Sequence, residues 1–363
     1  MLKSGRRKIF EVLRRDGVTS RAALAQKCEL TRPAVSAIID DFINLGLVCE
    51  IGQGNSTGGK PPRVIAFDDT SIAAIGLDLG EDYIIKGVLS NLSGKILKTA
   101  EATYKNSFDS ICSVAIEIVE NLKRHVQVQI SGVGVAVSGV VDIANNEVIG
   151  DATIDIKKQG FATILAKECN LPVMLEKRPN AAALGEAYFG SGKDFSSFIF
   201  ITTGRGVGAG VVFNGEIYRG FSGAAGEIGR LQLSNQGNLE EISRPGKLAE
   251  EYFATQKVLG GYSEFLQAVR SSDVKALELV KINAKQLAEA ARVAADFFDP
   301  EAIILGGQAL SFGDYHFDTF KEEFAKLSQS RETGQSCSLL KAEFGNYGVA
   351  FGGAQIILNK LVS

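Results

Sequence analysis

Apolar residues in the first 45 positions recur at the i, i+3, i+4 spacing of amphipathic helices. This spacing predicts three short helices over residues 5–45, and the buried stripe of the third comprises Val35, Ile38, Ile39 and Phe42. Ser20 and Thr31 immediately precede the second and third helices, where a side-chain oxygen can accept a free backbone N–H. Pro33 lies in the first turn of the third helix, where its missing N–H costs nothing.

The pattern then changes to strand-like alternation. Segments 47–51 and 63–67 alternate apolar and polar residues and are joined by a Gly- and Pro-rich loop, which predicts a β-hairpin. Two helices joined by a short turn and followed by a hairpin are typical of a winged helix-turn-helix, whose second helix enters the major groove of DNA. The candidate DNA contacts lie at the helix starts, off the buried stripe and on the hairpin: Ser20, Arg21, Thr31, Arg32, Pro33, Ser36, Ala37, Lys60 and Arg63. The alternative is a three-helix bundle with a solvated basic face.

The distribution of charge favours the DNA interpretation, although the formal net charge of −3 alone does not. Residues 1–67 contain 11 Lys and Arg against 6 Asp and Glu, a balance of +5 that leaves −8 for the rest of the chain. A basic head on an acidic body indicates that only the head faces a polyanion.

From residue 72 onward the chain repeats one plan. Segment 72–104 predicts three strands joined by tight turns, and segment 198–220 predicts three more, with Asn214-Gly215 as a two-residue hairpin turn. Helices follow each set, so we expect two similar lobes. The expected domains are a head over 1–70, a first lobe over 71–190 and a second lobe over 191–363, whose last helix can pack back on the first lobe.

Glycine-rich turns between such lobes can offer backbone N–H groups to the phosphates of a nucleotide. The candidate nucleotide-site residues follow predicted strands: Asp78, Gly80, Thr203, Gly204, Gly306 and Gly307. The alternative is that these are ordinary tight turns.

Several functional classes are excluded. The N-terminus is charged throughout and lacks the apolar core of a signal peptide, and no apolar run is long enough to span a membrane. The five cysteines are odd in number and form no C-x-x-C pair, which favours free thiols in a reducing cytoplasm.

Taken together, the sequence resembles the ROK family of repressors and sugar kinases. The resemblance rests on the winged helix-turn-helix and on five motifs: GLDLG at 76–80, NAAALGE at 180–186, the glycine-rich segment 202–230, IILGGQAL at 303–310 and GVAFGGAQIIL at 348–358. It implies an α/β body of two lobes with the hexokinase/actin-like, ribonuclease H-like fold, preceded by an N-terminal winged helix-turn-helix domain.

The departures from the family pattern concern the catalytic positions. Arg178 occupies the position of the aspartate that serves as general base in the kinases, and a guanidinium cannot accept a proton. Lys177 replaces an asparagine that binds the sugar, and Arg205 enters the phosphate turn between Gly204 and Gly206. The resemblance therefore implies no catalytic residue and no cofactor, with only a vestige of the nucleotide site.

The zinc site of the family is also missing. Arg230 stands where the family has histidine, Asn238 stands at the last cysteine, and the intervening loop is shorter. Without thiolate or imidazole ligands we expect no metal.

The resemblance places the effector site at eight residues: Ser138, Gly139, Lys177, Arg178, Asn180, Glu227, Arg230 and Glu240. Three interpretations remain open. The cations can pair with Glu176, Glu227 or Glu240 as a structural network, they can line a pocket remade for an anionic sugar derivative, or the pocket can take a neutral sugar.

The resulting hypothesis is a cytoplasmic, sequence-specific repressor of carbohydrate-related genes without enzymatic activity. Its expected partners are an operator in double-stranded DNA, a second copy of itself as a homodimer or dimer of dimers, and a sugar or anionic sugar derivative, with no membrane. Residues 68–71 are the expected hinge between head and body. The alternatives are a sugar kinase with an accessory DNA-binding head and a ligand-independent DNA-binding protein whose body only dimerises.

Overall fold

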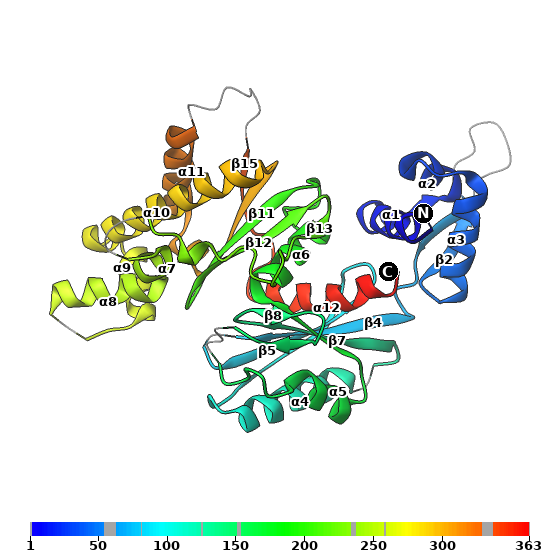
Figure 1. Cartoon of the computed structure of the whole chain (residues 1–363), viewed down its shortest axis with the longest axis horizontal. Coiled ribbons are helices and arrows are strands. Elements are labelled where there is room, and N and C mark those ends of the chain that lie inside the picture. The colour runs from blue at the N-terminus through cyan, green and yellow to red at the C-terminus, as the bar shows by residue number, and fades with distance from the viewer. Residues whose placement is uncertain are drawn as a thin grey trace. The chain divides into compact units, whose positions relative to one another are not determined.

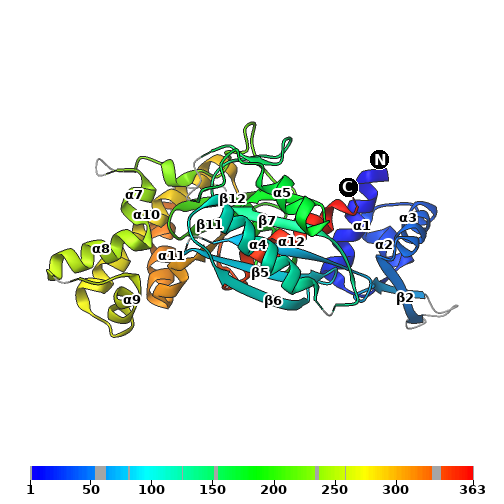
Figure 2. The same ribbon diagram turned by 90° about the horizontal axis from the view of Figure 1, so that it is seen from below.

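The computed structural model describes residues 2–53, 63–80, 82–124, 126–150, 154–233, 237–257, 259–328 and 337–362. The chain divides into two compact units, one formed by residues 1–189 with 346–363 and the other by residues 190–345 (Figures 1 and 2). Within the described ranges, no helix is long and apolar enough to cross a membrane.

The head of the first unit has three helices and a three-stranded sheet in the order β1-β3-β2. Ser20 and Thr31 are the N-caps of the second and third helices, and each side-chain oxygen accepts a backbone N–H three residues on. Gly46 ends the third helix with a φ of +70°, which favours glycine. The elements are α1 (Leu2–Asp16), β1 (Thr19–Ser20), α2 (Arg21–Cys28), α3 (Arg32–Asn44), β2 (Val48–Gln53) and β3 (Arg63–Phe67).

The body of the first unit is built on a five-stranded sheet in the order β10-β7-β4-β5-β6. β5 and β6 run antiparallel to their neighbours, whereas β7 and β10 are parallel to β4. The elements are β4 (Ile72–Leu79), β5 (Ile84–Asn91), β6 (Ile96–Thr103), α4 (Phe108–Lys123), β7 (Gln129–Val137), β8 (Val141–Asp142), β9 (Glu147–Val148), α5 (Phe161–Cys169), β10 (Val173–Lys177), α6 (Arg178–Phe189) and α12 (Gly348–Lys360).

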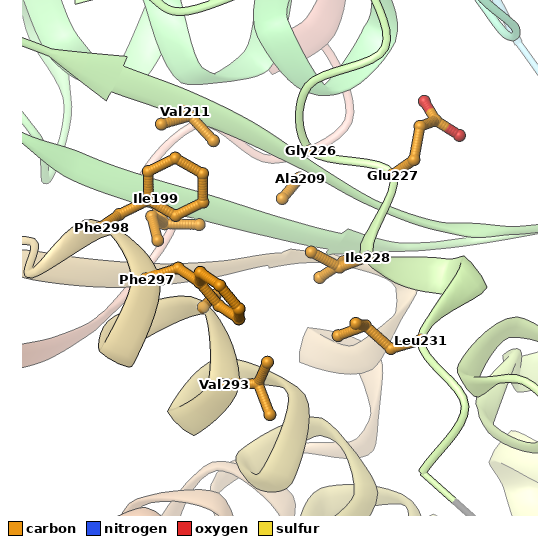
Figure 3. Close-up of a pocket in the computed structure, with 11 residues that line it drawn as sticks. Ile199, Ala209, Val211, Gly226, Glu227, Ile228, Leu231, Val293, Phe297 and Phe298 are labelled. Atoms are coloured by element: carbon orange, nitrogen blue, oxygen red, sulfur yellow. The ribbon is translucent and has the colours of Figure 1, made fainter. Parts of the chain in front are cut away.

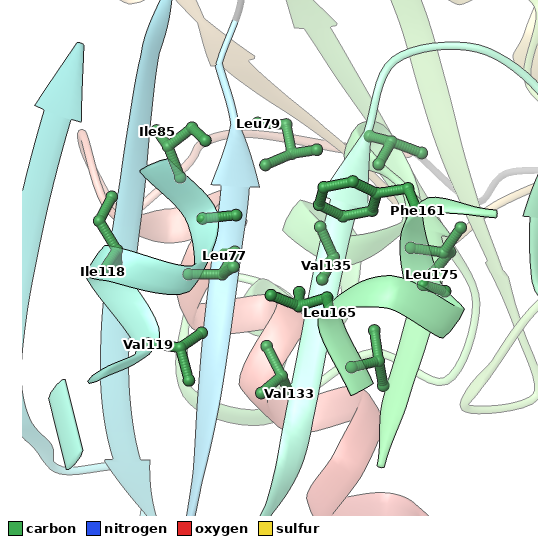
Figure 4. Close-up of a cluster of buried hydrophobic side chains, with 14 of the residues drawn as sticks. Leu77, Leu79, Ile85, Ile118, Val119, Val133, Val135, Phe161, Leu165 and Leu175 are labelled. Carbon is green, nitrogen blue, oxygen red and sulfur yellow. The ribbon is translucent and has the colours of Figure 1, made fainter. Parts of the chain in front are cut away.

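The hydrophobic core of this body lies between one face of the sheet and helices α4 and α5. Leu77 and Val135 from the central strands pack against Ile118 and Leu165 from the two helices (Figure 4). Burial of these branched side chains is the main favourable contribution to folding.

The other face of the sheet is covered by α12 (Figure 1). Glycines allow the helix backbone to approach the strands directly: a Cβ on Gly76 would lie 1.7 Å from the Ala350 carbonyl oxygen, and one on Gly134 would lie 1.9 Å from that of Gly353. Residues 346–363 therefore belong to the first unit: the C-terminal helix packs back on the first lobe, as the sequence allowed, although the expected domain boundaries counted these residues with the second lobe.

The head packs directly against the body of the first unit. One buried cluster contains Phe10 and Leu13 from α1, Ile72 from β4, and Ile357 and Leu358 from α12. Hydrogen bonds constrain the expected hinge at 68–71. The Thr70 amide donates to the Asp68 carboxylate, and the Ser71 hydroxyl donates to the Gly46 carbonyl. A hinge motion of this segment would therefore have to break these hydrogen bonds.

Arg14 is the polar centre of the contact between head and body. Its guanidinium lies 4.2 Å from the Tyr188 ring and 4.6 Å from the Phe10 ring, and it donates to the Asn359 side chain. Asn359 in turn donates to the Tyr188 hydroxyl over 2.9 Å. Burial lowers the pKa of Arg14 to about 10, and the aromatic rings offset part of the desolvation cost by cation–π attraction.

The second unit repeats the topology of the first, with a five-stranded sheet in the order β13-β12-β11-β14-β15. Asn214 and Gly215, with φ of +52° and +75°, form the predicted turn between β12 and β13. The elements are β11 (Phe198–Thr203), β12 (Val207–Phe213), β13 (Glu216–Ile217), η1 (Ile228–Arg230), α7 (Leu239–Ser243), α8 (Pro245–Gln256), α9 (Tyr262–Arg270), α10 (Val274–Phe298), β14 (Ala302–Gly307), η2 (Gln308–Phe312), α11 (Asp314–Ser328) and β15 (Ser338–Lys341). The expected duplication of lobes is thus confirmed.

A buried polar chain connects three helices of the second unit. The Asn283 side-chain amide donates to the Ser243 carbonyl over 2.6 Å, so its oxygen faces His316 Nε2, 2.8 Å away. An amide oxygen can only accept, and therefore Nε2 carries the proton. Burial lowers the pKa of His316 to about 4, which keeps the ring neutral.

We expect His316 to make stability depend on pH. The folded-state pKa lies below the ordinary histidine value of 6.5, so the unfolded chain binds the proton more readily. The stabilisation is complete above pH 6.5 and is lost as the pH falls toward 4. Between these pH values the free energy of unfolding, measured with urea, should fall with decreasing pH more steeply than that of the His316→Gln variant. The difference in slope should reach up to about 1.4 kcal/mol per pH unit. Parallel curves for the two proteins would contradict this prediction.

Candidate functional site

The candidate DNA-reading surface is the exposed side of α3. Val35, Ile38 and Ile39 are buried, whereas Arg32, Pro33 and Ala37 are exposed and Ser36 is half-buried. The helix begins at Arg32 with a capped N-terminus, so the arginine projects from the first turn. Recognition helices contact base edges with their N-terminal residues, and α3 has an exposed arginine at this end.

Two of the predicted contacts also hold the head together. Ser20 uses its hydroxyl to cap α2, and Arg21 links three elements: it donates to the Ser36 carbonyl over 3.1 Å and pairs with Asp40 at 2.7 Å and with Glu50 at 3.6 Å. Such pairs between α2, α3 and β2 fix the spacing of the helices. Sequence reasoning did not predict this role, because the carboxylates are distant in the chain.

Arg63 begins the second strand of the wing and is largely exposed, paired with Glu50 at 2.6 Å. Lys60, the other predicted wing contact, lies outside the described residues.

If Arg63 contacts a phosphate, the slope of log K for DNA binding against log salt concentration should be less steep by about one in Arg63→Ala. Fluorescence anisotropy at several salt concentrations measures this slope. The Arg15→Ala variant, which removes an exposed cation paired with Asp16, is the matched control. An unchanged slope for Arg63→Ala would exclude the contact.

In the first unit the predicted nucleotide and effector positions meet in one ion pair. Arg178, the first residue of α6, donates to Asp78 at the end of β4 through two nitrogens, over 2.7 and 3.2 Å. The Asp78 side chain is only 6% exposed and that of Arg178 20%. The carboxylate is therefore neutralised by a bidentate guanidinium, the strongest geometry for such a pair.

The residues around Arg178 are also buried. Glu176 accepts from the Lys177 amide over 3.0 Å and from the Asn180 side chain over 2.8 Å. Lys177 is 4% and Asn180 1% exposed, and the Asn180 amide oxygen has no hydrogen-bond partner among the described residues. Ser138 and Gly139 follow β7, and Gly139 has a φ of +95° that favours glycine.

In the second unit Glu240 supports the glycine turn after β11. It accepts the Val207 amide over 3.0 Å, and a Cβ on Gly206 would lie 2.6 Å from its carboxylate. Arg230 is exposed and pairs with Glu227 at 3.7 Å. Asn238, at the position of a family cysteine, instead caps α7. Among the residues that the structure describes, no three His, Cys, Asp or Glu side chains gather where a metal ion could bind.

The other candidate nucleotide residues have packing reasons of their own. Gly80 donates its amide to the Ile84 carbonyl and Gly204 donates to that of Gly206. A Cβ on Gly306 would lie 2.4 Å from the Phe200 ring, and Gly307 has a φ of +73° beside Thr203. The Thr203 hydroxyl accepts the Ala309 amide over 2.8 Å. These contacts are those of tight turns.

Sequence reasoning missed an apolar pocket of about 140 Å³ between the sheet of the second unit and α10 (Figure 3). Ile199 and Val211 line it from the sheet, and Phe297 and Phe298 line it from the helix. Glu227 lies at its edge, with the carboxylate directed away from the apolar side chains (Figure 3). The pair of adjacent phenylalanines at the end of a long helix is the feature of the sequence that could have indicated this pocket.

The duplicated sheets define an actin-like, ribonuclease H-like α/β protein, and the capped helices with their hairpin define a winged helix-turn-helix. The family model "ROK family" matches residues 74–360, and the model "Winged helix-turn-helix DNA-binding" matches residues 6–48. The chain therefore belongs to the ROK family, and the predicted fold is confirmed.

Both repressors and kinases resemble this chain. The xylose repressor of Bacillus spizizenii is 26% identical over 96% of this chain and 93% of its own length. The transcriptional dual regulator NagC of Escherichia coli is 24% identical over 83% of this chain and 79% of its own length.

Two solved structures show the same fold. A ROK family transcriptional regulator, a homologue of the E. coli Mlc protein, superimposes with a TM-score of 0.83 at 19% identity, over 99% of this chain and 98% of its own. A ROK glucokinase from Streptomyces griseus has a TM-score of 0.70 at 24% identity, over 78% of this chain and 98% of its own.

Proposed function

We propose that the protein is a DNA-binding transcriptional repressor of ROK type that controls carbohydrate-related genes, and that its kinase-like body has no catalytic activity. The observation that carries the proposal is the Asp78–Arg178 pair, in a chain that also contains a winged helix-turn-helix. The residue at the position of the catalytic base is a guanidinium that cannot accept the proton of a sugar hydroxyl.

The relatives support the regulatory assignment. Two of them are named as the xylose repressor and as the DNA-binding regulator NagC, and their matches cover 96% and 83% of this chain. We propose that this chain acts in the cytoplasm as a homodimer or dimer of dimers on a near-palindromic operator, since each winged helix reads one half-site.

We propose a sugar as the effector, bound in the first unit by the residues around Arg178. Arg178 pairs with Asp78 and Arg230 pairs with Glu227, which supports the interpretation of these cations as a structural network. An arginine paired with a carboxylate attracts an added anion less than an unpaired one does. A neutral sugar therefore fits the site better than an anionic derivative.

Helix α6 offers a physical route from this site to the head. It begins at Arg178 and ends at Phe189, and Tyr188 in its last turn packs on Arg14 of α1. A ligand that displaces α6 would change the support of the head. To act as a switch it must bind the two states with free energies that differ by about 1–3 kcal/mol.

The test combines a thermal-shift screen with a turnover assay. A sugar at 100 times its Kd should stabilise the chain by about 2.7 kcal/mol and should release it from DNA. ATP turnover with the same sugars should stay at the background rate. Turnover well above background would establish the kinase alternative, and DNA binding insensitive to every sugar, sugar acid and sugar phosphate would favour the ligand-independent alternative.

A further inference from the structure

The second unit exposes five aromatic side chains near its apolar pocket. They are Phe213, 53% exposed, Tyr218, 49%, Phe221, 109%, Phe297, 81%, and Phe298, 37%. We call these five residues the aromatic patch. Neither the DNA-reading surface nor the effector site uses them, and exposed rings at this density are costly unless another surface covers them.

Local geometry places the patch around the pocket. Phe213 lies on the same side of β12 as Ala209 and Val211, which line the pocket, because side chains alternate along a strand. The Tyr218 ring lies 6.3 Å from that of Phe298, which also lines the pocket.

Phe221 belongs to a loop anchored at the same place. The loop 219–225 is closed by a hydrogen bond from the Ala225 amide to the Arg219 carbonyl. It joins Tyr218 to Gly226, a residue of the pocket wall. The fully exposed Phe221 thus lies in a loop with both ends near the pocket, because Tyr218 contacts Phe298 and Gly226 belongs to the pocket wall.

The pocket has the size of an aromatic ring. Its volume is about 140 Å³ and most of its lining is apolar (Figure 3). Cavities of roughly 150 Å³ lined by Leu, Ile and Phe stay dry and bind benzene. The pocket is thus suited to a phenylalanine side chain.

The area of the patch is also that of a protein interface. At roughly 200 Å² for a fully exposed aromatic side chain, the five exposed fractions amount to roughly 650 Å². This exceeds the largest apolar patch of a typical monomer, roughly 300–600 Å². It approaches the roughly 800 Å² that each partner contributes to a stable interface.

We propose that the aromatic patch is the surface through which two copies of this chain associate, with Phe221 of each copy in the pocket of the other. A projecting ring and a ring-sized pocket on one surface are self-complementary, which is the requirement of a two-fold symmetric interface. The proposal rests on the proposed function for its choice of partner, since two half-sites require two heads.

The test is the oligomeric state of the full chain without DNA, measured by sedimentation equilibrium over a range of concentrations. Phe221→Ser and Phe297→Ser should each weaken dimerisation by at least about 100-fold, because each substitution removes two buried rings per dimer. Leu259→Ser is the matched control, since Leu259 is a 103% exposed apolar residue of the same unit outside the patch. Circular dichroism verifies that each variant is folded.

Three outcomes would overturn the proposal. They are a wild-type chain that stays monomeric at all concentrations, a dimer that neither phenylalanine variant weakens, and a dimer that Leu259→Ser weakens equally. Because no DNA or sugar is present, failure of this proposal is distinguishable from failure of the repressor assignment.

Discussion

Replacing Arg32 with alanine should weaken operator binding by about 5- to 150-fold and should relax the sequence preference. The arginine is exposed in the first turn of α3, where recognition helices meet base edges. Loss of a bidentate contact to a base costs about 1–3 kcal/mol of discrimination. Fluorescence anisotropy with the operator and with single-base variants measures both effects.

The matched control for this experiment is Arg270→Ala, which removes the same charge from an exposed position at the end of α9. It should leave affinity and sequence preference unchanged. If Arg32→Ala lowers affinity equally for every sequence, the arginine contacts phosphate and does not read bases. Unaltered binding would show that Arg32 does not contact the DNA.

Breaking the Asp78–Arg178 pair should destabilise the chain strongly. Asp78→Ala and Arg178→Ala each leave one charge without its partner in a site where the side chains are 6% and 20% exposed. A cost of about 2–4 kcal/mol is expected, slightly reduced from the fully buried case because Arg178 reaches solvent. Urea unfolding followed by circular dichroism measures it.

The double variant tests whether the pair itself is responsible. Removing both side chains together should cost less than the sum of the single changes, with a coupling of about 1–3 kcal/mol. Arg7→Ala with Glu11→Ala, a more exposed pair one turn apart on α1 with side chains 37% and 38% exposed, should show a coupling below about 1 kcal/mol. Additive single effects at Asp78 and Arg178 would show that the pair does not stabilise the fold.

Local signals predicted much of this fold. Ser20 and Thr31 cap helices because their side chains can reach an N–H three residues away, and Asn214-Gly215 turns a hairpin because both residues tolerate positive φ. Such effects depend on neighbours in the sequence. The stripe of Val35, Ile38, Ile39 and Phe42 is buried for the same reason, since its period alone defines one face of a helix.

Contacts between distant residues could not be predicted in this way. Asp78 and Arg178 are 100 residues apart, and Arg14 meets Tyr188 and Asn359 from two other helices. Nothing in the local sequence selects one partner among the available carboxylates or rings. The placement of α12 and the pocket beside α10 depend in the same way on how whole elements pack.

The central claim is that the chain reads a specific DNA sequence. The most direct measurement is the ratio of its Kd for random-sequence duplex to its Kd for the best duplex recovered by in vitro selection, at one physiological salt concentration. The account predicts a ratio of at least about 10³, with a selected sequence that is near-palindromic. Equal affinity for selected and random duplexes would contradict the account.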